Sequence, residues 1–164
     1  MDQDSFRHFY EKTVPTLRAY VLQRCARVEL ADDILQEAFL RFLKSAPASL
    51  TEAQMRSYLY RTSENLIVDR WHDIQREQGI AAAHAPNAVN APAPEVMSTM
   101  ERAFAQLESK QQMLVWLAYV EGFDHKEIAA AANIGIKSVR VLLFRAKQKL
   151  LGILKDMGIH PENQ

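Results

Sequence analysis

Apolar residues recur at three- and four-residue spacings over most of this chain. That spacing aligns side chains on one face of a helix, and no segment shows the strict alternation of a strand. Near the N-terminus the pattern is carried by six aromatic or aliphatic residues, Phe6, Phe9, Tyr10, Leu17, Tyr20 and Val21. Pro15 interrupts it and predicts a kink or a break near Val14, because proline removes a helix hydrogen bond. The expected fold class is all-α.

Two further helices are expected before residue 80. Asp32 and Asp33 predict the start of a second helix over residues 32–44, since negative charge favours a helix N-terminus. Its apolar stripe consists of Ile34, Leu35, Ala38, Phe39, Phe42 and Leu43. Residues 45–54 read as a loop that leads into a third helix, expected to run through Trp71. That helix carries Met55, Tyr58, Leu59, Leu66 and Ile67.

Residues 80–95 differ in composition from the rest of the chain. They contain Pro86, Pro92 and Pro94 among alanines and asparagines, without apolar periodicity. Each proline disfavours helix in the residue before it, so the segment predicts a flexible linker. The chain is therefore expected to form two small helical domains, 1–79 and 96–160.

A helix-turn-helix is predicted for residues 121–150. Asp124 and Glu127 have the spacing of a capping box. The turn is expected at residues 133–135, because Asn133 and Gly135 tolerate left-handed backbone angles. Before this motif, Ser98 and Ser109 are candidate N-caps, and Gly122 is expected to end the preceding helix.

The last helix has one apolar and one basic face. Residues expected to face inward are Val139, Leu142, Leu143, Ala146 and Leu150. Those expected to face outward are Lys137, Ser138, Arg140, Val141, Phe144 and Arg145. A recognition helix needs positive charge for phosphates and N-terminal side chains for base edges. The alternative is an ordinary helical hairpin with a solvated basic face.

Charge is balanced overall but unevenly distributed. The chain has 20 basic and 20 acidic residues, which argues against a protein that grips nucleic acid unaided. Residues 137–155 carry basic side chains and no acid, whereas residues 29–37 carry acidic side chains and no base. This distribution suits a protein that contacts both DNA and another protein.

The sequence offers little for catalysis or metal binding. Cys25 is the only cysteine, and the five histidines are scattered without metal-site spacing. No nucleophile elbow or phosphate-binding glycine loop occurs. No catalytic residue, metal or cofactor is expected. An apolar run long enough for a membrane span and a secretory signal are also missing, so the expected location is the cytoplasm.

Three segments together resemble the extracytoplasmic-function (ECF) sigma factors. Residues 31–39, ADDILQEAF, resemble the acidic helix with which sigma factors bind the polymerase clamp helices. Residues 56–61, with Asn65 and Asp69, are similar to the following helix, which is used in promoter melting. Residues 121–150 resemble the helix-turn-helix that reads the minus-35 element. The order matches, and no room remains for the central domain of housekeeping sigma factors.

The resemblance implies residue roles. Polymerase binding falls to residues of the acidic helix, Asp32, Asp33, Gln36, Glu37 and Arg41. Minus-ten DNA contacts fall to the loop and the third helix, Ser49, Thr51, Gln54, Tyr58, Tyr60, Arg61, Asn65 and Arg70. Minus-35 contacts fall to Lys137, Ser138, Arg140, Val141, Phe144 and Arg145. The implied partners are core RNA polymerase, promoter DNA and a cognate anti-sigma factor, for a protein that is monomeric when free.

The sequence departs from the family at several positions, and two other functions remain open. Asn133 replaces a frequent glycine, Val141 and Leu142 replace a polar or basic pair, and Leu107-Glu108 lacks a frequent proline. One rival is a dimeric operator-binding regulator, although the receiver-like strands of such proteins are missing. The other is an interaction protein that mimics a sigma factor. Such a protein would retain the acidic helix, but its DNA-reading face would have lost the residues needed to bind DNA.

Overall fold

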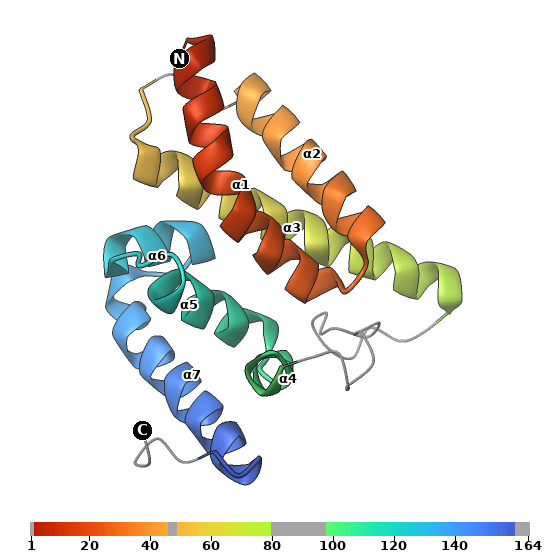
Figure 1. Ribbon diagram of the computed structural model, residues 1–164, viewed down its shortest axis with the longest axis vertical. Helices are drawn as coiled ribbons and strands as arrows, with labels where there is room; N and C mark the ends of the chain where they lie inside the picture. The colour runs from red at the N-terminus through yellow and green to blue at the C-terminus, as the bar shows by residue number, and fades with distance from the viewer. Residues whose placement is uncertain (1, 46–48, 80–97, 160–164) are drawn as a thin grey trace.

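The computed structural model describes residues 2–45, 49–79 and 98–159, and every regular element in these ranges is a helix. The all-α prediction is confirmed. The predicted linker, residues 80–95, lies outside the described residues. Figure 1 shows α1, α2 and α3 packed together in one half of the molecule, and α4 to α7 in the other half.

The first half is built from three long helices, α1 (Gln3–Cys25), α2 (Val28–Ser45) and α3 (Glu52–Gln78). Asp2 caps α1 by accepting a hydrogen bond from the Ser5 N–H at 2.7 Å. Pro15 lies inside α1, so of the kink or break expected near Val14 the break does not occur. Thr13 and Leu17 are buried on either side of it. Packing of the buried face outweighs the one backbone hydrogen bond that proline removes.

The helix boundaries of this half differ from those expected. Helix α2 begins at Val28, one turn before Asp32, because Ala26 adopts left-handed angles (φ 59°) and turns the chain directly from α1 into α2. Helix α3 begins at Glu52 and continues beyond Trp71 to Gln78. Its start is fixed by a capping box between Thr51 and Gln54.

The second half contains α4 (Thr99–Ala105), α5 (Ser109–Tyr119), α6 (His125–Ala132) and α7 (Ile136–Asp156). Ser98 caps α4, as predicted. The prediction for Ser109 is wrong by one residue, because Glu108 is the N-cap of α5. Helix α5 ends before Gly122, which adopts φ +69° in the turn that follows.

The two halves share one hydrophobic core. Buried residues of α1, α2 and α3 form a single cluster with a set from the second half, Met113, Leu114, Leu117, Phe123, Ile128, Ala131, Ala132 and Val139. Helix α6 packs directly on α3. A smaller cluster, Phe104, Leu107, Val115 and Ala146, lies within the second half. The sequence pattern did not predict the contact between the halves.

A buried ion pair joins α1 to α3. Arg24 has a fully buried side chain, and its Nη2 donates to Glu64 Oε1 at 2.5 Å. The Tyr20 hydroxyl donates to the other carboxylate oxygen at 2.8 Å. Burial, reinforced by the Glu64 carboxylate, raises the pKa of Tyr20 well above its ordinary value. Burial also raises the pKa of the neighbouring Cys25 to about 11, so this thiol stays protonated at neutral pH.

Glu64→Ala should lower the free energy of unfolding by about 3–5 kcal/mol, because it leaves the Arg24 charge buried without its carboxylate. The matched control is Lys12→Ala, which removes an exposed ion pair to Glu52 at 3.3 Å in the same half. That control should change stability by less than about 1 kcal/mol. Urea denaturation measures both, and equal small effects would contradict a structural role for the buried pair.

Candidate polymerase and nucleic-acid interfaces

Helix α2 presents an exposed face that begins acidic and ends apolar. Asp32, Asp33 and Gln36 are exposed, and Glu37 is half-buried. Asp32 Oδ1 accepts from Arg18 Nε at 3.0 Å. The opposite face is anchored in the core by Ala31, Ile34, Leu35, Ala38 and Phe39. All five predicted polymerase-binding residues therefore lie on α2, outside its buried face.

The C-terminal half of α2 adds apolar surface that was not expected from the sequence. Leu43 was assigned to the inner stripe, but its residue is 60% exposed, and Leu40 is exposed as well. The start of α2 at Val28 and its packing on α1 and α3 set the rotation that turns Leu43 outward. Arg41 lies between these leucines and pairs with Glu37 at 3.0 Å. Such a face suits a protein partner with a basic, partly apolar groove.

Five of the predicted minus-ten residues follow one face of α3. Thr51, Gln54, Tyr58, Arg61 and Asn65 recur at alternating three- and four-residue steps, which aligns them on a helix. All are exposed except Tyr58, which is half-buried. Its hydroxyl donates to the Arg41 carbonyl at 3.3 Å, and its ring packs on Phe42. Ser49 is exposed in the turn before this face.

The structure does not bring Tyr60 and Arg70 to this face. Tyr60 lies roughly 160° around the helix from Tyr58, and Arg70 roughly 180° from Arg61. Arg70 is half-buried. Tyr60 is fully buried under the second half and is inaccessible to DNA in this conformation. Burial, reinforced by the Glu121 carboxylate, raises the pKa of Tyr60 well above its ordinary value.

The helix-turn-helix forms as the sequence predicts. The N–H of Glu127 donates to Asp124 Oδ1 at 2.8 Å, and the N–H of Asp124 donates to Glu127 Oε1 at 3.0 Å. Asn133 adopts left-handed angles (φ 56°, ψ 49°) and ends α6. Ile128 of α6 and Val139 of α7 are fully buried where the two helices meet the core. The short turn and small alanines of α6 allow this close approach.

The outer face of α7 is free for a partner. All six predicted minus-35 residues are exposed, and Phe144 and Val141 are 61% and 49% exposed. Within the described ranges, no ion pair engages Lys137, Arg140 or Arg145. Ile136, which was given no role from the sequence, is exposed at the start of the same helix. The face therefore combines unpaired positive charge with exposed apolar side chains.

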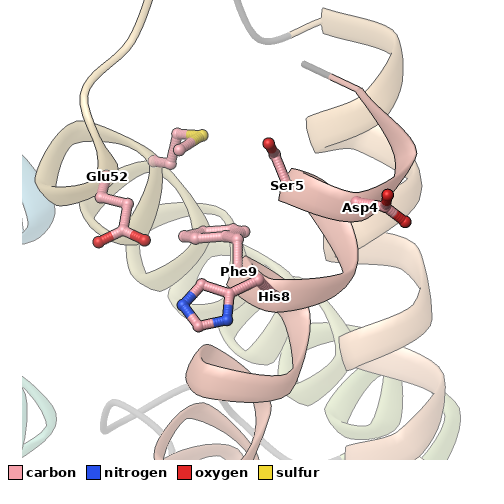
Figure 2. Close-up of a pocket in the computed structure, with 6 residues that line it drawn as sticks. Asp4, Ser5, His8, Phe9 and Glu52 are labelled. Atoms are coloured by element: carbon pink, nitrogen blue, oxygen red, sulfur yellow. The ribbon is translucent and has the colours of Figure 1, made fainter.

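One further hollow lies between the starts of α1 and α3. This open pocket of about 430 Å³ is lined by Asp4, Ser5, His8, Phe9, Glu52 and Met55. Figure 2 shows His8 and Phe9 of α1 lying across from Glu52 of α3. No residue assigned a role from the sequence lines it. The part of the chain that the structure describes contains no cluster of metal-ligating side chains and no helix long and apolar enough to cross a membrane.

Two family models match successive parts of the chain. Residues 9–77, from α1 to near the end of α3, match the family model of sigma-70 region 2. Residues 98–150, which include the helix-turn-helix, match that of sigma-70 region 4. The chain belongs to the ECF group of the sigma-70 family. As an ECF sigma factor, it directs promoter-specific transcription initiation with RNA polymerase.

Similar proteins span nearly the same length. The ECF RNA polymerase sigma factor EcfG of Rhodopseudomonas palustris is 24% identical over 155 residues, covering 92% of this chain and 86% of its own. SigM of Bacillus subtilis is 24% identical over 159 residues, covering 93% of this chain and 96% of its own. The sigma factor RpoE of Bartonella quintana, solved in complex with the anti-sigma factor NepR, shares the fold. Its TM-score is 0.68 at 20% identity, with 92% of this chain and 97% of that chain covered.

Proposed function

We propose that this sigma factor divides its work among three surfaces. The exposed face of α2 binds core RNA polymerase, the outer face of α3 contacts the minus-ten element, and the outer face of α7 reads the minus-35 element. The observation that carries this proposal is the pairing of an acidic, solvent-facing α2 with an unpaired basic face on α7, in the order of regions 2 and 4. The family matches support the same order.

The remaining parts of the proposal follow from this role. The protein acts as a regulatory initiation factor rather than an enzyme, as a monomer when free, and in the cytoplasm where bacterial transcription occurs. An anti-sigma factor is proposed as a further partner, supported by the NepR complex of the similar Bartonella protein. The region 2 match argues against the operator-binding dimer. The exposed Arg140 and Arg145 argue against a mimic with a degraded DNA face.

The exposed apolar residues of α7 also suit DNA. Val141 and Phe144 lie beside Arg140 and Arg145 in the N-terminal half of the helix. In the major groove, an apolar side chain recognises the thymine methyl group, whereas arginine recognises guanine or a phosphate. The replacement of a polar pair by Val141 and Leu142 therefore changes the base preference without removing the reading surface.

Reversing charge on α2 should weaken polymerase binding. Asp33→Lys with Glu37→Lys places like charge against a basic groove, so affinity for the core enzyme should fall at least about tenfold. A matched control reverses two exposed acids of α1, Asp4→Lys with Glu11→Lys, and should bind normally. A pull-down with core polymerase measures both. Unchanged binding by a folded α2 variant would refute this assignment.

Removing the arginines of α7 should reduce promoter use without affecting polymerase binding. If the arginine contacts a base, Arg140→Ala and Arg145→Ala should each weaken the free energy of binding to the cognate promoter by about 1–3 kcal/mol, and transcription from it should fall accordingly. A phosphate contact would instead weaken binding to all sequences and reduce the salt dependence. Run-off transcription and core affinity are measured on the same variants. Lys155→Ala, at the far end of α7, is the control; full transcription by both arginine variants would mean that α7 does not read DNA.

A further inference from the structure

Two side chains from the first turn of α5 close the ends of other helices. Lys110 Nζ donates to the carbonyl of Ala132, the last residue of α6, at 2.9 Å. Gln112 Nε2 donates to the carbonyl of Phe104, in the last turn of α4, also at 2.9 Å. The last carbonyls of a helix have no N–H partner within their own helix, so both contacts satisfy groups that helix geometry leaves open. Figure 1 shows α5 lying between α4 and α6.

The two contacts lie in different environments. Gln112 is buried, with 1% of its surface exposed, so its contact belongs to the interior of the second half. Lys110 is exposed, and in the described part of the chain no carboxylate pairs with its ammonium group. The carbonyl end of a helix carries partial negative charge, which a cation stabilises. The charge of Lys110 is therefore directed at the end of α6.

The end of α6 is also the turn of the helix-turn-helix. Ala132 is followed by Asn133, which adopts left-handed angles. The N–H groups of Asn133 and Ile134 both donate to the Ala129 carbonyl, the second of them at 3.1 Å. Ile134 is partly buried against the main core. The contact from Lys110 thus meets the chain immediately before the turn that leads into α7.

The start of α7 has few other side-chain contacts that fix its direction. Its N-cap, Gly135, supplies no side-chain hydrogen bond. The space around Gly135 is open, because an added Cβ would meet only Ser138 Oγ, at 4.0 Å. The predicted minus-35 residues begin with Lys137, in the first turn of α7. A change in the angle of the turn would therefore move these reading side chains directly, and base recognition tolerates little displacement.

We propose that Lys110 is a positioning residue for minus-35 recognition. Its ammonium group holds the C-terminal end of α6 and so fixes the direction in which α7 leaves the turn. Lys110 acts through the turn and makes no contact with DNA. The inference rests on the proposed function, in which α7 reads the minus-35 element.

The test measures discrimination by the holoenzyme. Run-off transcription is compared between the cognate promoter and the same promoter with a scrambled minus-35 element. Lys110→Met keeps the apolar stem and removes the charged donor, so the ratio of the two yields should fall about three- to tenfold. Lys110→Arg restores a charged donor and should recover most of the ratio. Affinity for core polymerase should be the same in both variants and the parent.

Two controls separate positioning from loss of stability and loss of charge. Ser98→Ala removes the N-cap of α4 in the same half, where Ser98 Oγ accepts from the Glu101 N–H at 3.1 Å. It should lower stability and leave the ratio unchanged. Lys155→Met makes the same substitution at an exposed lysine near the C-terminal end of α7. It should also leave the ratio unchanged.

Amide hydrogen exchange, followed by NMR in the free full-length chain, tests the geometry without a promoter. In Lys110→Met the amides of Asn133 and Ile134 should exchange faster, because the end of α6 has lost its brace. The amide of Glu127, in the capping box at the start of α6, should exchange as in the parent. Lys110→Arg should restore slow exchange at the turn.

The outcomes are distinguishable. An unchanged ratio or unchanged exchange in Lys110→Met would overturn the inference, as would equal losses in the methionine and arginine variants. An equal fall in transcription from both promoters would also overturn it, because a direct phosphate contact weakens binding to all sequences. A parent that does not discriminate between the two promoters would instead refute the proposed role of α7, whatever the exchange rates show.

Discussion

Two buried carboxylates, Glu64 and Glu121, each need a tyrosine and an arginine as hydrogen-bond donors. Because each set of contacts includes α3, the other helices are held in position around this helix. Glu64 meets Tyr20 and Arg24 of α1, whereas Glu121 meets Tyr60 and Arg56 of α3. The rings of Tyr20 and Tyr60 join the two sites, with centroids 5.5 Å apart. The folded structure loses stability when a buried carboxylate loses its hydrogen-bond donors. Each site therefore favours the one helix register that keeps its donors in place. The position of the second half relative to the first follows from the same network.

Helical geometry then assigns a task to each side of α3. The side bearing Gln54, Tyr58, Arg61 and Asn65 is left to solvent or to the edge of α2. The side bearing Ser57 and Tyr60 is covered by α6. A residue changes side with a shift of one or two positions, since each step turns the helix by about 100°. Neighbours in sequence such as Tyr58 and Tyr60 therefore have different environments.

Local chemistry was the part of the fold that the sequence could predict. The capping box at Asp124 and Glu127, the left-handed Asn133 and the exposed face of α7 depend on residues a few positions apart, and all were expected correctly. The errors at Pro15 and Leu43 arose where packing against another helix overrode a local preference. Of the site residues, the burial of Tyr60 was not foreseen because its partner Glu121 is 61 positions away, and its contact with DNA stays a prediction. The three-residue spacing of Ser57, Tyr60 and Ser63 was the available signal for a second buried face on α3.

The polar contact between the two halves is not completely satisfied. Arg56 Nε is buried without a hydrogen-bond partner among the described residues, although Nη1 of the same side chain donates to Glu121. A buried donor that lacks an acceptor costs free energy, so this contact contributes less to stability than complete pairing would. The shared apolar core and the hydrogen bond from Tyr60 to Glu121 together hold the second half of the chain on α3.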